Sequence, residues 1–569
     1  MRLFETENTM NVRQVQWLIL FITLVNATGM ITPFINQGDS VTYASLAQHM
    51  VVHGDWARLV LDGQDWLDKP HFPFWVGALF FKLLGISAFS YILPGFLFHL
   101  LGGYYTYRMA RMFYSKNAAW LALLVYMSVY HIMASSIEVR AEAFLTGSIM
   151  GACYYWLRFD ATSRFKHLLL AAIFSATAVM TKGVFTLITI GSGLVCMWLF
   201  LGQWRKLFSL KWLAALLLTS ICTAPELIAL YVQFDLNTPQ QVYANTDVSK
   251  PFSGIQFFVW DSQFGRFFNT GPIKNTAGNP AYFLHVFVWA FLPWVAVYIA
   301  TLAKDMRHFF TRNIAQTEKA PFVFLFTSFS ITFALFSATS FQLDYYTVIV
   351  FPFAAIACGK YLSDGLAANN GHTKLLISQG VISLLMVILT IAIAWHTENT
   401  TVFAGAVTMV VASLILAYCH RTQWRHQVLL VLPVCAVAVF YLVLSVLVTL
   451  TYLKVAPALN ASKILQNHPP APVVVLDMEI AGRELALYTP NPCTTIYDTA
   501  KLPTSKEPFY LMVRGLQLAN LPAPAGGRWE QIAQAQWAID KTGTLPRMLR
   551  LAKGIEPLDD VRIVRFVPN

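Results

Sequence analysis

Asp39 and Lys69 lie in a polar stretch that follows the first long apolar run of the chain, and both could take part in chemistry. A carboxylate such as Asp39 can act as a general base toward a hydroxyl group, or it can hold a metal ion. A lysine such as Lys69 can bind a phosphate as a mobile point charge. Each has a structural alternative. Asp39 could cap the amphipathic helix expected after it, and Lys69 could extend from an interfacial segment toward water.

Glu142 shares a short turn with Glu138 and Arg140. It could support Asp39, or the two carboxylates could bind a divalent cation, because hard cations favour oxygen ligands. The alternative is a local ion pair of Glu142 with Arg140 or Lys182. Zinc is not indicated, since none of the seven cysteines forms a pair with metal-ligand spacing.

Arg266 and the segment 342–346 are further clusters of polar groups outside the apolar runs. Arg266 could bind a phosphate through two hydrogen bonds, or it could be an ordinary loop arginine. Tyr345 and Tyr346 are adjacent hydrogen-bond donors. These groups predict a site assembled from several turns rather than from one motif.

The elements that must position these residues are membrane helices. The chain is 56% hydrophobic and only 12% charged, whereas soluble domains are nearer a quarter charged. Many runs reach the roughly 20 apolar residues that a spanning helix needs. Barrel strands alternate and are about half as long, so an outer-membrane barrel is excluded.

Clusters of lysine and arginine in short loops predict the cytoplasmic side, and they account for the basic net charge without nucleic-acid binding. Counting spans between these loops gives about thirteen helices. This predicts an all-α polytopic domain over residues 1–455, with external loops 36–90 and 233–280. Residues 456–569 are expected to form a small periplasmic α/β domain with strands at Val473–Leu476, Phe509–Val513 and Val561–Val567.

The expected helix centres carry almost no charge, and Glu226 is the clear exception. Transporters keep ionisable groups inside the membrane because they use them there. Here the polar groups gather in external turns, where they could face a substrate held at the membrane surface. Phe72–Leu84 is too short to span and is expected to lie along that surface.

The external motifs resemble those of the GT-C membrane glycosyltransferases. The nearest branch is the aminoarabinose transferases that modify lipid A, and the protein O-mannosyltransferases are more distant. The first loop carries the matching stretches Gly38-Asp39-Ser40-Val41-Thr42-Tyr43, His53-Gly54-Asp55-Trp56 and Trp66-Leu67-Asp68-Lys69-Pro70-His71. Later matches follow in the family's order: Arg140-Ala141-Glu142, Thr181-Lys182-Gly183, Gly265-Arg266-Phe267 and Gln342-Leu343-Asp344-Tyr345-Tyr346.

Four positions depart from the family pattern. Ser40 stands in place of Glu, His71 in place of the second Pro, Val184 in place of Pro, and Gln342 in place of Lys. These departures bear on the sugar and the acceptor more than on the type of reaction.

The resemblance implies an inverting enzyme in the bacterial inner membrane, with its active site facing the periplasm. It would move a sugar from a polyprenyl (undecaprenyl) phosphate to lipid A or another envelope glycolipid. An O-glycosyltransferase acting on protein or glycan is the alternative within the class, and a lipid or solute transporter is the alternative outside it.

The resemblance also implies roles for the residues. Asp39 and Glu142 would be catalytic, with a divalent cation possible between them. Lys69 and Arg266 would bind the phosphate, and Tyr345 or Tyr346 would donate a hydrogen bond to it. Tyr43 and Trp66 would lie near the sugar or the phosphate, unless they anchor the chain at the membrane interface.

Overall fold

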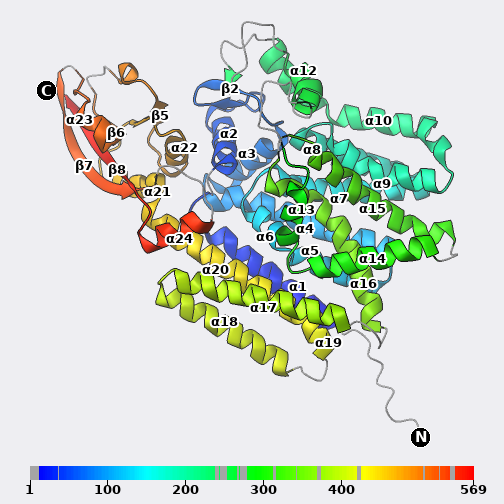
Figure 1. Cartoon of the computed structure of the whole chain (residues 1–569). Helices are drawn as coiled ribbons and strands as arrows, with labels where there is room; N and C mark the ends of the chain where they lie inside the picture. Colours follow the sequence, from blue (N-terminus) through cyan, green and yellow to red (C-terminus); the bar gives the residue numbers. More distant parts are fainter. Residues whose placement is uncertain are drawn as a thin grey trace.

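The computed structural model describes residues 12–35, 38–236, 242–243, 253–265, 268, 278–311, 315–340, 342–367, 373–419, 424–503, 507–524, 526–538 and 545–568. Within these ranges the chain is mostly helical, with a small sheet near its C-terminus (Figure 1). This confirms the predicted combination of a helical bundle and a C-terminal α/β part.

Six helical segments in the described ranges are long and apolar enough to cross a membrane. They are Val12–Ile31, Phe165–Lys182, Gln316–Ser337, Asp344–Ala367, Thr373–His396 and Gln427–Val455. The number rises to nine if each of three bent helix pairs counts as one span. The larger number of about thirteen, and the division of the chain at residue 455, stay predictions.

Three bent helix pairs break apolar stretches of the bundle. Helices α5 (Lys116–Met127) and α6 (Tyr130–Ile137) meet at 59°. The other two pairs are α10 (Leu210–Cys222) with Ala224–Asp235, bent by 44°, and α13 (Tyr282–Ala290) with α14 (Val295–Thr311), bent by 114°. Pro225 and Pro293 lie at the last two breaks. A proline lacks the N–H that a continuing helix needs, so these breaks follow from the sequence.

Close packing holds the centre of the bundle. Helix α16 (Phe351–Ala367) lies against α5, and a Cβ on Gly359 would fall 2.5 Å from the backbone nitrogen of Ala122. Small residues at such crossings allow helices to approach closely where lipid removes the hydrophobic drive for association. Helix packing therefore explains why position 359 is a glycine.

The first polar stretch forms its own compact layer beside the bundle. It contains α2 (Asp39–His53), a short hairpin of β1 (Val60–Leu61) and β2 (Gln64–Trp66), and α3 (Phe72–Leu84). Strand β3 (Val242–Tyr243) adds to β2 in parallel. The bounds predicted for the short aromatic helix are those observed for α3.

The C-terminal part contains a five-stranded sheet in the order β5-β4-β6-β8-β7. Strands β4 (Val473–Leu476), β6 (Phe509–Arg514) and β8 (Asp559–Pro568) confirm the three predicted strands, whereas β5 (Cys493–Ile496) and β7 (Gly527–Trp537) were not anticipated. The residues of β7 are mostly exposed or half-buried, and many of them are polar. This strand therefore lacks the apolar run that marks β4, β6 and β8.

Helix α22 (Glu479–Tyr488) joins this C-terminal part to the first polar layer, next to α2 (Figure 1). The Gln48 side chain donates to the carbonyl of Ala486 at 2.7 Å, and the Tyr488 hydroxyl accepts from the backbone of Ile35 at 2.7 Å. Arg483 forms an ion pair with Asp62, with Nε 2.8 Å from the carboxylate. The helix that begins at Asp39 is therefore supported from the far end of the sequence.

Candidate active site

Asp39 is the first residue of α2, and its carboxylate does not cap that helix. The N-cap is Gly38, at φ 81°, and it makes no side-chain capping bond. The half-buried Asp39 carboxylate instead accepts a hydrogen bond from the Tyr345 hydroxyl at 3.2 Å. The helix-cap alternative is therefore wrong.

Tyr345 and Tyr346 lie in the 3₁₀ helix Asp344–Val350 that precedes α16, and they face different partners. The Arg140 guanidinium stacks over the Tyr345 ring, with its carbon 4.1 Å from the ring centroid. The Lys182 nitrogen lies 3.6 Å from the centroid of the Tyr346 ring. The two tyrosine rings are 5.4 Å apart, so they connect Asp39 on one side to Lys182 on the other.

Glu142 forms an ion pair with Lys182, which confirms one of its two predicted local partners. Glu142 begins α7 (Ala141–Thr162) and Lys182 ends α8 (Phe165–Lys182), so each charge complements its helix dipole. Their side chains are only 2% and 8% exposed. Arg140, the other candidate partner, pairs with Glu138 instead. Burial raises the pKa of Glu138, and the neighbouring Arg140 charge opposes that rise.

Lys69 lies 2.5 Å from Asp68 and is 12% exposed. It borders a cavity of about 420 Å³ together with Lys182 and Tyr346. Most of the remaining wall is apolar, with side chains from the ends of several helices, among them Val184, Phe258, Phe264, Leu335 and Phe336. The lining also includes the carboxylates of Asp68 and Glu226. A largely apolar cavity with two lysines suits a ligand that has a phosphate and a hydrocarbon chain.

Tyr43 and Trp66 are buried in an aromatic cluster instead of lying at an exposed belt. Both rings meet Phe74 edge-on, at centroid distances of 5.0 and 5.5 Å. Burial and the nearby Asp39 charge raise the pKa of Tyr43 well above its usual value, so its hydroxyl keeps its proton. The belt-anchor alternative is wrong for these two residues, and their predicted contact with the substrate stays a prediction.

Arg266 lies outside the described residues. In the part of the chain that the structure describes, no three or more His, Cys, Asp or Glu side chains form a group that could hold a metal ion. A cation between Asp39 and Glu142 stays a prediction, and it would compete with Lys182 for the Glu142 carboxylate.

Three residues at the site were not singled out as site residues by sequence reasoning. Lys182 was noted inside the motif Thr181-Lys182-Gly183 and as a possible ion-pair partner of Glu142. His71 and Glu226 form a fully buried pair, with Nδ1 2.9 Å from the carboxylate. Two signals pointed to this pair: Glu226 is the one charge noted in its predicted helix, and His71 departs from the family pattern.

Comparisons with known proteins support the resemblance. A family model described as dolichyl-phosphate-mannose-protein mannosyltransferase matches residues 68–228. The undecaprenyl phosphate-alpha-4-amino-4-deoxy-L-arabinose arabinosyl transferase 1 of Proteus mirabilis is 23% identical over 61% of this chain and 60% of its own length. The corresponding transferase of Pseudomonas aeruginosa is 24% identical over 67% of this chain and 65% of its own length.

Solved structures extend the likeness over nearly the whole chain. ArnT from Cupriavidus metallidurans in the apo state aligns with a TM-score of 0.72 at 16% identity, covering 98% of each chain. The same protein bound to undecaprenyl phosphate aligns with a TM-score of 0.70 over 97% of this chain and 98% of the other. The chain therefore has the fold of this solved protein, and the resemblance seen in the loop motifs is confirmed. In sequence, the chain spans 60% of the length of the Proteus relative.

Proposed function

We propose that this GT-C chain is an inverting glycosyltransferase. It would move a sugar from an undecaprenyl phosphate donor to lipid A or another envelope glycolipid. The observation that carries the proposal is the continuity between Asp39 and the lysine-bearing cavity, through the adjacent rings of Tyr345 and Tyr346. The names of the Proteus relative and of the ligand-bound Cupriavidus structure favour the same donor class.

The cavity supplies what a polyprenyl phosphate leaving group needs. When the acceptor oxygen bonds to the anomeric carbon, the bond from that carbon to the donor phosphate oxygen breaks. The phosphate leaves with additional negative charge. Lys69 and Lys182 stand at the cavity to neutralise that charge, and the apolar wall accommodates the lipid. Arg266, predicted to share this task, is part of the proposal by resemblance alone.

Asp39 acts on the acceptor, and its role depends on the acceptor group. A hydroxyl acceptor loses its proton as it attacks, and Asp39 can take that proton. A phosphate acceptor is already ionised, so Asp39 would then orient it or share a divalent cation with it. Tyr345 fixes the carboxylate through its 3.2 Å hydrogen bond in either case.

The orientation is part of the proposal. With about thirteen spans, the first loop, the cavity mouth and the C-terminal part lie on the periplasmic side of a bacterial inner membrane. A protein or glycan O-glycosyltransferase would use the same donor cavity with another acceptor. A transporter would move a lipid without forming a bond.

The test uses purified full-length protein, radiolabelled undecaprenyl phosphate sugars, and lipid A, glycan and peptide acceptors. We expect wild-type protein to transfer label covalently to a glycolipid. Asp39→Asn and Lys69→Ala should lower transfer by at least about 100-fold. Asp364→Asn and Lys82→Ala are matched controls, because these charges lie away from the cavity lining.

Each alternative has its own outcome in that assay. Label on peptide or glycan alone would identify the O-glycosyltransferase. Movement of the donor across a vesicle membrane without covalent transfer of the sugar would favour the transporter. Full activity of both Asp39→Asn and Lys69→Ala would refute the assigned site.

A further inference from the structure

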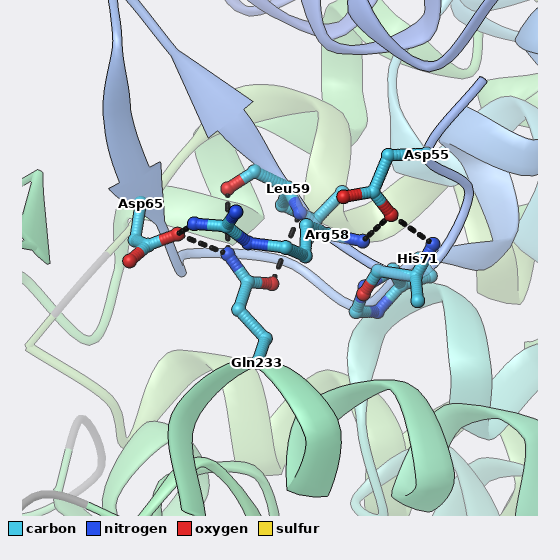
Figure 2. Close-up of polar contacts among 7 residues, drawn as sticks. Asp55, Arg58, Leu59, Asp65, His71 and Gln233 are labelled. Carbon is cyan, nitrogen blue, oxygen red and sulfur yellow. Dashed lines mark hydrogen bonds and ion pairs between the residues drawn. The ribbon is translucent and has the colours of Figure 1, made fainter. Parts of the chain in front are cut away.

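The segment 55–71, called here the Lys69 loop, is held from one helical stretch that is distant in sequence. Helix α11 (Ala224–Leu230) runs on into a π-helical turn at Tyr231–Asp235. Glu226 near its start and Gln233 near its end both point into the Lys69 loop, and both are buried. Figure 2 shows Gln233 extending from this stretch toward Leu59 and Asp65.

Gln233 clamps the backbone of the loop. Its Oε1 accepts from the N–H of Leu59 at 3.0 Å, and its Nε2 donates to the carbonyl of the same residue at 2.9 Å. Nε2 also donates to Asp65 at 2.9 Å. Asp65 in turn pairs with Arg58 at 2.9 Å (Figure 2). Leaving these buried groups without partners would be costly, so the loop is fixed at this point.

Glu226 fixes the other end of the loop at His71. Its carboxylate accepts from the His71 backbone N–H at 2.9 Å and lies 2.9 Å from Nδ1 of the ring. The ring Nε2 lies 3.1 Å from the carbonyl of Ala57, which can only accept. The ring therefore bridges Glu226 on one side and Ala57 on the other. Both side chains are 0% exposed, so losing either partner would leave a buried polar group unpaired.

The family pattern predicts proline at position 71. A proline has no backbone N–H and no imidazole ring, so it could make none of these three hydrogen bonds. Proline stiffens a loop through its fixed backbone angle. In this chain the hydrogen bonds of His71 to Glu226 and Ala57 hold the loop instead.

Lys69 lies two residues before His71, and both Lys69 and Glu226 border the cavity. We propose that Glu226 and Gln233 are positioning residues that hold Lys69 where it meets the phosphate of the polyprenyl donor. The inference rests on the proposed function for the identity of the ligand. It adds that phosphate binding by Lys69 depends on α11 and the π-helical turn.

The test measures binding of undecaprenyl phosphate to the full-length protein in nanodiscs, so it does not depend on transfer activity. Glu226→Leu and Gln233→Met should each weaken binding by about 10- to 100-fold, because a shift of about 1 Å at a reacting or binding group can cost that much. Glu226→Gln should stay within about threefold of wild type, because an amide can keep both bonds to a neutral His71. Gln466→Met, at the exposed residue that follows α21 (Pro457–Leu465), is the matched control for Gln233→Met.

A double-mutant cycle separates positioning from a general loss of structure. In a Lys69→Ala background, Glu226→Leu and Gln233→Met should change binding by less than about threefold, because the group that they position is gone. If Glu226→Leu or Gln233→Met weakened binding by the same factor in the Lys69→Ala background as in wild type, the inference would be overturned. Wild-type affinity of both single variants would also overturn it. If Glu226→Leu does not fold, the same double-mutant cycle is measured with Gln233→Met alone.

The outcomes also distinguish this inference from the proposed function. Wild-type protein that binds undecaprenyl phosphate but transfers no sugar would refute the transferase while leaving the cycle decisive. Wild-type protein that binds no undecaprenyl phosphate would overturn the positioning of Lys69 toward that ligand.

Discussion

The hydroxyl of Tyr345 lies 3.2 Å from the carboxylate of Asp39, although 306 residues separate the two in the chain. This contact joins the start of α2 to the turn before α16. It places a neutral donor on the carboxylate proposed to act on the acceptor. The same turn presents Tyr346 to Lys182, so a shift of this turn would disturb both halves of the site.

Tyr345→Phe should lower transfer by about 10- to 100-fold, because a hydrogen bond to a charged group contributes about 1.5–3 kcal/mol. The measurement is kcat/KM with the radiolabelled donor. Tyr497→Phe, at an exposed position in the C-terminal part, is the control. Unchanged kcat/KM in Tyr345→Phe would show that the contact does not serve the reaction.

Lys182→Met should destabilise the protein by about 3 kcal/mol, because it leaves the buried Glu142 carboxylate without this partner. Adding Glu142→Gln should restore much of that stability, since the uncompensated charge is removed. Thermal unfolding in detergent measures both effects. Both variants should bind undecaprenyl phosphate more weakly than wild type, because both lack the Lys182 cation at the cavity. Wild-type binding by the double variant would contradict the role of Lys182.

A divalent cation should bind only weakly between Asp39 and Glu142 in the wild-type protein, because Lys182 already holds the Glu142 carboxylate. Lys182→Ala should bind Mn²⁺ more tightly, since oxygen ligands are released. Titration followed by electron paramagnetic resonance gives both affinities. Equal affinities in the two proteins, or no effect of Asp39→Asn, would exclude a cation at these residues.

Cys493 in the C-terminal sheet should react slowly with iodoacetamide. Burial raises the pKa of its thiol to about 12. At pH 8 only about one molecule in 10⁴ then carries the reactive thiolate, and the rate should rise about tenfold for each pH unit up to pH 10. Peptide mass spectrometry measures the labelling. Rapid labelling at pH 8 in folded protein would contradict the raised pKa of this thiol.

Local patterns in the sequence predicted several elements well. The aromatic run Phe72–Leu84 is α3, and the apolar run Val473–Leu476 is β4. Elements of this kind are determined by residues that are neighbours in the sequence, so they can be predicted from it. The 59° bend between α5 and α6 has no such local signal, because no proline or glycine lies at the break, where the Tyr130 N–H donates to the carbonyl of Leu292 at 2.9 Å.

Partners that lie far apart in the chain could not be chosen from the sequence. Glu142 had two nearby candidates in Arg140 and Lys182, and only the packing of α7 against α8 selects Lys182. The pair of His71 and Glu226 spans 155 residues. Each residue was notable alone, but neither identified the other.

The support that α22 gives to α2 has a consequence for how the protein unfolds. Since Gln48, Asp62 and Ile35 hold partners beyond residue 480, the start of α2 and the C-terminal sheet should open together as one cooperative unit. The backbone amides of both regions should then exchange hydrogen at similar rates. A protease that removes the C-terminal part should also loosen α2, and Asp39, the proposed catalytic carboxylate, would be displaced although its own segment stayed uncut.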